Sequence, residues 1–397
     1  MTARRRKWAV RGCASRRLSA ALAVTLLVGL GCGTTPGNLG RATGGTPGLG
    51  QAGGSGEAGA SGEAGTGGAP PRSVCGNGAT EDGEACDDGN ATPSDGCSES
   101  CLVEPGWSCA GLSSVCTPTH PSCVGLAASC SGSNGDCCAS SLVTGGTFQR
   151  ENDLVDSPFA ATIDDFRLDT YEVTAGRFAR YVAGYPANKP AAGSGKNPRN
   201  STDPGWDPAW NAFLPADRAT LTANVQCDST YQTWGNGDNL AMNCVTWFDA
   251  NAFCIWDGGR LPTSAEWDYA AAGGSDQRYY PWSNPFTDET IDDSYAVYSP
   301  ATYVAEVGSK SPKGDAKYGQ SDLAGNVWEW VQDWYVPYYT TACDNCAALV
   351  RPPDTSERVI RGGSAYDDAS YLNTFTVDVY NPTTRINYIG FRCARSR

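Results

Sequence analysis

Short alternating runs of apolar and polar residues fill the chain from Leu142 onwards. Residues 142–150 and 163–174 alternate in this way, which predicts β-strands. The pair Val359-Ile360 predicts a buried strand, residues 388–393 predict a second short strand, and Gly362-Gly363 predicts a sharp turn between them. Two strands that bracket a polar loop commonly build a pocket, and loop 365–371 contains neither cysteine nor histidine.

Three stretches show helical spacing of apolar residues. Thr174 is placed to cap a helix that carries Phe178, Tyr181 and Val182. The second helix lies within residues 244–259 and ends at Gly258-Gly259; its predicted inward side chains are Phe248, Ala252, Phe253 and Ile255. In the third, Thr263 and Glu266 form a capping box, and Gly273 ends the helix.

Residues 1–32 combine a basic start with an apolar run from Leu18 to Leu30, which is short for a membrane span and typical of a signal peptide. The run ends at Leu30-Gly31-Cys32, which resembles a bacterial lipobox and predicts lipidation of Cys32; cleavage and secretion is the alternative. Residues 33–72 are rich in glycine, alanine and serine and predict a flexible, disordered tether.

The chain has 18 cysteines among 397 residues, and sixteen remain after Cys13 and Cys32 are set aside. An even number in an exported chain predicts disulfides. Residues 73–119 form a cysteine-rich module too small for an apolar core, so disulfides must hold it. Its residues 75–109 resemble the disulfide-rich repeat of many myxobacterial surface proteins. The cysteine-rich segment 120–141 follows.

The repeat contains residues that could bind calcium or zinc, but each pattern has a simpler structural explanation. Asp87, Asp88, Asn90 and Asp95 carry the oxygen ligands that calcium prefers, but Asx and glycine turns explain them better. Zinc on the cysteines is disfavoured because an oxidising compartment favours disulfides. The single histidine, His120, lies in a linker and is predicted to be solvated, which excludes histidine-based catalysis and metal sites.

The net charge of −14 makes a nucleic-acid partner unfavourable. An acidic surface is compatible with solubility and with binding of divalent cations, but the net charge alone establishes neither property.

Six motifs together resemble the formylglycine-generating enzyme family, also called the sulfatase-modifying factor domain. They are EVTAGRFARYV, CVTWFDANAFCIWDGGRLPTSAEWDYAAAGG, YPW, DLAGNVWEW, RVIRGGS and IGFRCAR, in this order within residues 142–397. The resemblance implies a compact α+β domain of the C-type-lectin-like kind with little regular secondary structure. Active members use copper and oxygen to convert a cysteine of an exported sulfatase into formylglycine.

The resemblance also implies structural features at numbered positions. It pairs Cys254 with Cys393, while Cys227 and Cys244 bracket a glycine- and asparagine-rich loop and are expected to pair. The DLAGNVWEW motif carries a calcium site in the family. Carried over, its ligands are the side chains of Asp322 and Glu329 with the backbone oxygens of Gly325 and Val327; a carboxylate pair that only accepts backbone N–H bonds is the alternative.

The chemistry of the family does not carry over. Active members bind Cu(I) through two cysteines after the GGS motif, and those positions hold Asp367 and Leu372 here. Trp328 and Ser364 match residues that line the family's oxygen pocket and are the pocket candidates. Cys343 and Cys346 form a C-x-x-C pair that could be redox-active or bind copper; a short structural disulfide is the preferred interpretation.

The sequence therefore predicts an exported protein of the outer membrane, cell surface or periplasm, anchored to a membrane through Cys32. Its main domain is predicted to be a non-oxidase binding or scaffold module for an unknown peptide or carbohydrate. The alternatives are a formylglycine-generating oxidase and a purely adhesive protein. Its tryptophans are expected to serve the core rather than a ligand platform; they include Trp256, Trp267, Trp282, Trp328, Trp330 and Trp334.

Overall fold

The structure is a computed structural model that describes residues 74–397, apart from 93–94, 105–106, 125, 127–135, 153–159, 302 and 337–340. Segment 1–32 with Cys32, the tether 33–72 and Cys130 lie outside the described residues. Within the described residues, no helix is both long and apolar enough to cross a membrane.

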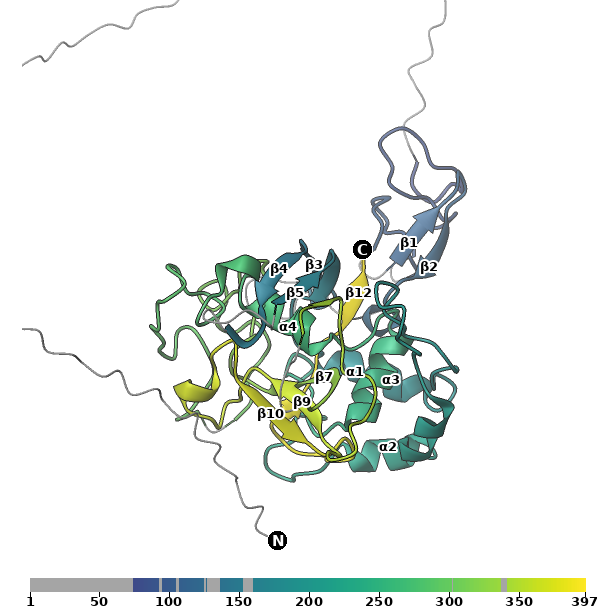
Figure 1. Cartoon of the computed structure of the whole chain (residues 1–397). Coiled ribbons are helices and arrows are strands. Elements are labelled where there is room, and N and C mark those ends of the chain that lie inside the picture. The colour runs from purple at the N-terminus through teal and green to yellow at the C-terminus, as the bar shows by residue number, and fades with distance from the viewer. Residues whose placement is uncertain are drawn as a thin grey trace, which may run out of the picture. The chain divides into compact units, whose positions relative to one another are not determined.

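Small sheets and short helices form the main domain (Figure 1). One sheet has the order β10-β9-β7-β11, in which β9 pairs antiparallel with β7 and β10, and β11 pairs parallel with β7. Its strands are β7 (Trp328–Trp334), β9 (Arg358–Arg361), β10 (Val377–Tyr380) and β11 (Ile389–Gly390). The strands predicted at Val359-Ile360 and within 388–393 are thus present.

Two further sheets contain the alternating runs at the start of the domain. Each run divides into two strands of different sheets, because two residues of irregular backbone interrupt it, 144–145 in the first run and 164–165 in the second. The strand orders are β12-β6-β3 and β4-β5-β8. The strands are β3 (Ser140–Val143), β4 (Gly146–Gln149), β5 (Ala160–Ile163), β6 (Phe166–Asp169), β8 (Cys343–Asp344) and β12 (Ala394–Ser396).

The three predicted helices are present, and the N-caps predicted for the first and third are confirmed. Helix α1 (Ala175–Gly184) is capped by Thr174, α3 (Trp247–Trp256) by Thr246, and α4 (Ser264–Ala271) by the capping box of Thr263 and Glu266. Helix α2 (Arg218–Asn224) was not predicted. The 3-10 helices are Pro121–Cys123, Arg150–Asn152, Pro208–Phe213, Gly274–Asp276 and Ala369–Tyr371.

Helix α3 differs from its prediction in which faces are buried. Phe248, Ala252 and Phe253 are buried as expected, but Ile255 is only partly buried. Asp249 and Asn251 are buried as well, so the helix is surrounded by protein along most of its length rather than on one face. The main aromatic core lies around it and includes Phe178, Trp247, Trp330 and Phe391.

Buried ion pairs connect the end of the domain to its start. Arg177 of α1 pairs with Asp169 at 3.0 Å and with Asp257 at 2.6 Å, and Arg395 of β12 pairs with the same two carboxylates. Arg392 donates to both carboxylate oxygens of Glu329 at 2.8–2.9 Å. We call these six residues the ion-pair frame: Asp169, Arg177, Asp257, Glu329, Arg392 and Arg395.

His120 is partly buried rather than solvated, contrary to its prediction. Its Nδ1 lies 3.0 Å from the Thr119 hydroxyl, and its Nε2 is buried without a partner among the described residues. Burial, together with the nearby Arg395, lowers the pKa of His120 to about 4. The ring is therefore neutral at physiological pH. Residues 120–123 lie against the domain here, where the Ser122 N–H donates to Asp257.

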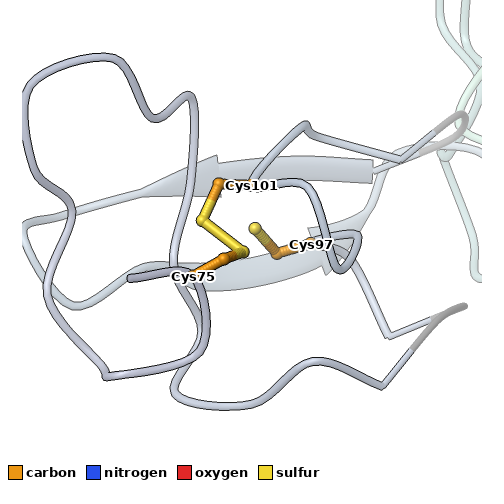
Figure 2. Close-up of side chains that lie close together, drawn as sticks. All are labelled: Cys75, Cys97 and Cys101. Carbon is orange, nitrogen blue, oxygen red and sulfur yellow. A yellow bond between two sulfur atoms is a disulfide. The ribbon is translucent and has the colours of Figure 1, made fainter. Parts of the chain in front are cut away.

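Disulfides and backbone turns hold the repeat. Its bonds are Cys75–Cys101, Cys86–Cys97 and Cys109–Cys116, and the last pair joins β1 (Trp107–Ala110) to β2 (Val115–Pro118). Figure 2 shows the sulfur of Cys97 beside the bond between Cys75 and Cys101. Because these sulfurs are engaged in disulfides, they are not the thiolates that zinc requires.

Candidate functional site

The loop after β9 brings Asp367 against the two pocket candidates. One carboxylate oxygen, Oδ2, accepts hydrogen bonds from Trp328 Nε1 at 2.8 Å, Ser364 Oγ at 2.5 Å and the Ser364 N–H at 3.1 Å. The other oxygen, Oδ1, has no hydrogen-bond partner among the described residues. Asp367 is half-buried, so that this oxygen lies near solvent.

Glycines allow the loop to turn this tightly. Gly362 and Gly363 have φ values of 99° and 75°, which side-chain-bearing residues rarely adopt. A Cβ on Gly363 would lie 2.8 Å from a methyl carbon of Leu372. The double glycine therefore sets both the direction of the loop and the close packing of Leu372 beneath it.

Leu372 belongs to the interior. It is fully buried in a cluster with Tyr280, Ala296 and Ala324. Trp328 and Ser364 are also buried, at 2% and 0% exposure. Neither pocket candidate therefore presents its own surface to a ligand, and Asp367 is the part of this group that solvent reaches.

All cysteines within the described residues are disulfide-bonded. Cys254–Cys393 and Cys227–Cys244 are the pairs expected from the sequence, and Cys123 pairs with Cys138. Cys343 and Cys346 are bonded to each other. Cys343 lies on β8, which belongs to the sheet of β4 and β5, whereas Trp328 and Ser364 lie on or after strands of the β7–β9 sheet.

The residues expected to bind calcium occupy a buried acidic site. The Asp322 carboxylate accepts the Gly308 N–H at 2.5 Å, and burial raises the pKa of Asp322 to about 6. Glu329 has both oxygens engaged, by Arg392 and by Trp267 Nε1 at 2.9 Å. Asp322 therefore fits as a ligand, while Glu329 in this conformation does not.

Glu172 adds a third carboxyl group that the sequence did not single out. It accepts the Val327 N–H at 3.1 Å and Asn326 Nδ2 at 2.5 Å. Burial, with the neighbouring Asp322 and Glu329, raises the pKa of Glu172 well above its usual value. The buried carboxyl groups of Glu172, Asp322 and Glu329 thus all lie near one guanidinium, that of Arg392. Because these acidic groups outnumber that cation, the site is compatible with binding of a hard cation.

In the repeat, Asp87 shapes the backbone. It is fully buried and accepts the N–H groups of Gly76, Asn77, Gly78 and Gly89 at 2.8–3.1 Å. Burial alone would raise the pKa of Asp87, and these hydrogen bonds lower it instead. The arrangement favours the turn interpretation over calcium.

A separate cavity of about 490 Å³ lies in the loops after α4. It is lined by Ser275, Asp276, Gln277, Arg278, Ser283, Asn284, Pro285 and Phe286. Asp276 is ion-paired with Arg278 and Lys317, so its charge is already balanced. No site residue predicted from the sequence lies in this cavity.

Comparison with known proteins supports the resemblance. Residues 129–397 match the family profile of the sulfatase-modifying factor enzyme 1-like domain. The formylglycine-generating enzyme of Thermomonospora curvata is 37% identical over 38% of this chain and 54% of its own length. The inactive C-alpha-formylglycine-generating enzyme 2 of Bos taurus is 33% identical over 38% of this chain and 48% of its own length.

The chain thus spans about half the length of these two relatives. Among solved structures, PvdO from Pseudomonas aeruginosa matches 64% of this chain and 93% of its own, with 23% identity and a TM-score of 0.45. The family profile covers most of the chain, including both strands around loop 365–371. The chain therefore belongs to the sulfatase-modifying factor (FGE-sulfatase) family, with its α+β fold of few helices and many disulfides.

Proposed function

We propose that this domain is a non-oxidase binding module whose ligand site centres on Asp367. The observation that carries the proposal is the set of three hydrogen bonds from Trp328 and Ser364 to one oxygen of Asp367. They hold a carboxylate where active relatives are expected to hold a copper-binding thiolate. The second such position, Leu372, is fully buried among apolar side chains.

The chemistry of the ligands explains why oxidation is not proposed. Cu(I) is a soft cation that prefers sulfur, whereas carboxylate oxygens suit hard cations. The cysteines of the described residues are all held in disulfides, and Cys343 of the Cys343–Cys346 bond lies on a strand of another sheet. The relatives include both a formylglycine-generating enzyme and a protein described as inactive, so membership of the family is compatible with either function.

The direct test uses the purified full chain, Cu(I), oxygen and a peptide with the sulfatase motif. We expect no aldehyde on the peptide cysteine by mass spectrometry, with an active relative as positive control. Aldehyde formed by this chain would contradict the proposal and support the alternative function, a formylglycine-generating oxidase.

A gain-of-function variant sharpens this test. Asp367→Cys combined with Leu372→Cys restores two sulfurs at the positions inferred for copper. We expect the reduced double variant to bind one equivalent of Cu(I) in competition with a chromophoric chelator. The wild-type chain and the single variant Asp367→Cys are the controls and are expected to bind much more weakly. Equal binding by all three would argue against these positions.

We also propose calcium at Asp322, supported by the excess of buried acid there. Binding would need ionised Asp322 and backbone oxygens of Gly325 and Val327, and Glu329 only if it moves from Arg392. We expect Ca²⁺ to raise the melting temperature of the chelator-treated chain, and Asp322→Asn to abolish the increase. Asp344→Asn, at an exposed position, is the control. An equal increase in both variants would exclude this site.

Export and a lipid anchor at Cys32 remain proposals of the sequence. The disulfides of the described residues support an oxidising compartment. Mass spectrometry of the N-terminal peptide from membranes should detect acylated Cys32, and Cys32→Ser should release the chain from them. A chain that stays in membranes after this change would contradict the anchor. The ligand is proposed to be a peptide or a carbohydrate.

A further inference from the structure

Four tyrosines gather beside Asp367, although they come from segments far apart in the sequence. Tyr366 packs edge-on against Tyr231 at 6.0 Å and against Tyr388 at 6.2 Å between ring centroids. Tyr388 packs in the same way on Tyr380 at 6.2 Å, and their hydroxyl groups lie 2.6 Å apart. We call Tyr231, Tyr366, Tyr380 and Tyr388 the tyrosine surface.

Backbone contacts place this surface next to the Asp367 carboxylate. The Trp328 N–H donates to the Tyr388 carbonyl at 2.9 Å, and the Trp328 ring nitrogen donates to Asp367. Tyr366 directly precedes Asp367, and its N–H donates to Ser364 Oγ. Tyr231 is 42% exposed, and the other three tyrosines are partly exposed, so the rings are within reach of a ligand.

Two polar atoms at this place lack partners within the described part of the chain. The hydroxyl of Tyr366 is buried without a hydrogen bond. Asp367 Oδ1 likewise accepts none, although Oδ2 accepts three. Buried polar groups are normally satisfied, so the unpartnered Tyr366 hydroxyl, one residue before a half-exposed carboxylate, points to a bound molecule.

The charges around the tyrosine surface indicate what kind of ligand it would bind. Asp228 adds a second carboxylate, which accepts the Tyr231 N–H at 3.0 Å and Asn387 Nδ2 at 3.2 Å. Neither Asp228 nor Asp367 has an ion pair with the arginines and lysines of the described residues. Arg385, from the same segment as Tyr388, is paired with Asp249 at 2.7 Å. Acid that no side-chain cation balances is thus combined with aromatic rings.

We propose that the tyrosine surface and Asp367 bind an organic ammonium group, such as a lysine side chain or a quaternary amine. The rings offer their negative faces to the cation, the Asp367 Oδ1 oxygen offers its charge, and the Tyr366 hydroxyl bonds a neighbouring polar atom of the ligand. The inference rests on the proposed binding function, and narrows its ligand from any peptide or carbohydrate to one that carries an ammonium group.

The test compares two probes of the same shape. Choline carries a trimethylammonium group, and 3,3-dimethylbutan-1-ol carries a neutral tert-butyl group in its place. Calorimetric or NMR titration of the full chain is expected to give binding of choline about tenfold or more tighter than that of the neutral probe. Equal affinities, or no choline binding at millimolar concentrations, would overturn the inference.

Substitutions at Asp367 and Tyr231 test whether choline binds at the tyrosine surface. Asp367→Asn and Tyr231→Ala are each expected to weaken choline binding about tenfold, while Phe286→Ala, at an exposed aromatic in the separate cavity, leaves it unchanged. Tyr231 is the more exposed ring, so Tyr231→Ala keeps the test valid if Asp367→Asn perturbs folding. Choline binding unaffected by both changes would overturn the assignment.

Failure of this inference and failure of the proposed function give different results. A glycan or an amine-free peptide that binds and is lost in Asp367→Asn would refute the ammonium ligand and leave the binding module intact. Aldehyde formation on a sulfatase peptide would instead refute the binding module.

Discussion

The ion-pair frame and the Asp367 site use the same residue types in opposite ways. In the frame, Glu329 faces Arg392, and Asp169 and Asp257 face two arginines, so each buried carboxylate has an adjacent cation. At the site, the donors to the Asp367 carboxylate among the described residues are the neutral groups of Trp328 and Ser364. The frame carboxylates stabilise the fold through their ion pairs, whereas the Asp367 carboxylate has no ion pair among the described residues and can face a ligand.

The largest expected effect comes from breaking the frame. Arg392→Met removes the guanidinium and leaves Glu329 buried with Trp267 as its remaining donor. Loss of one partner of a buried pair should lower the free energy of unfolding by up to about 5 kcal/mol. Urea unfolding measures the change. Arg397→Met, which breaks an exposed pair with Asp165, is the matched control and should be close to wild type.

The next effect concerns the disulfide beside Arg392. Cys254 and Cys393 are 139 residues apart, whereas Cys343 and Cys346 are 3 apart. Because a cross-link restricts the unfolded chain more when it closes a longer loop, Cys254→Ala with Cys393→Ala should cost about 4 kcal/mol. Cys343→Ala with Cys346→Ala should cost clearly less in the same unfolding experiment. A reversed order would contradict the expected dependence on loop length.

Asp268 of α4 is an intermediate case, since Arg361 lies 3.9 Å away and one of its oxygens has no partner in the described region. Burial raises the pKa of Asp268 from 3.8 to about 6, and the positive charge of Arg361 limits this increase. Between about pH 4 and 6 the folded chain keeps a proton that the unfolded chain has released. Stability should therefore fall as pH rises through this window, by on the order of 2 to 3 kcal/mol.

Asp268→Asn cannot titrate, so this contribution to the pH dependence should vanish. Unfolding in urea at intervals from pH 4 to pH 7 checks it. Asp354→Asn, at an exposed position, should keep the wild-type slope. An unchanged slope in Asp268→Asn would assign the dependence to other groups.

The smallest effect on stability is expected at the site itself. Asp367→Asn keeps an oxygen that can accept from Trp328 and Ser364, so the free energy of unfolding should change by less than about 1 kcal/mol. The same substitution is expected to lower ligand affinity. A large loss of stability with unchanged binding would place Asp367 with the frame rather than with a site.

What could be predicted from the sequence was mostly local. The caps of α1 and α4 depend on residues three positions apart, so Thr174, Thr263 and Glu266 were visible as motifs. The turn at Gly362-Gly363 was visible for the same reason. The pairing of Cys254 with Cys393 came from the family resemblance rather than from local pattern.

The remainder depends on contacts made only by folding. Nothing near Glu329 in the sequence indicates that Arg392 occupies its oxygens, and nothing near His120 indicates that its Nε2 is buried. The tyrosine surface likewise assembles from residues 231, 366, 380 and 388, each of which resembles an ordinary surface or core tyrosine on its own. Local sequence patterns predicted the helices, strands and turns. The contacts between residues far apart in the sequence could be found only from the structure.

The burial of Arg392, Cys393 and Arg395 determines when the domain can finish folding during its synthesis. The partners of these residues, Asp169, Cys254 and Glu329, are synthesised much earlier and must wait for residues 392–395 to leave the ribosome. The interior is therefore completed only after translation has passed this point. A nascent chain truncated before Arg392 should remain sensitive to protease, while a few additional codons should confer resistance.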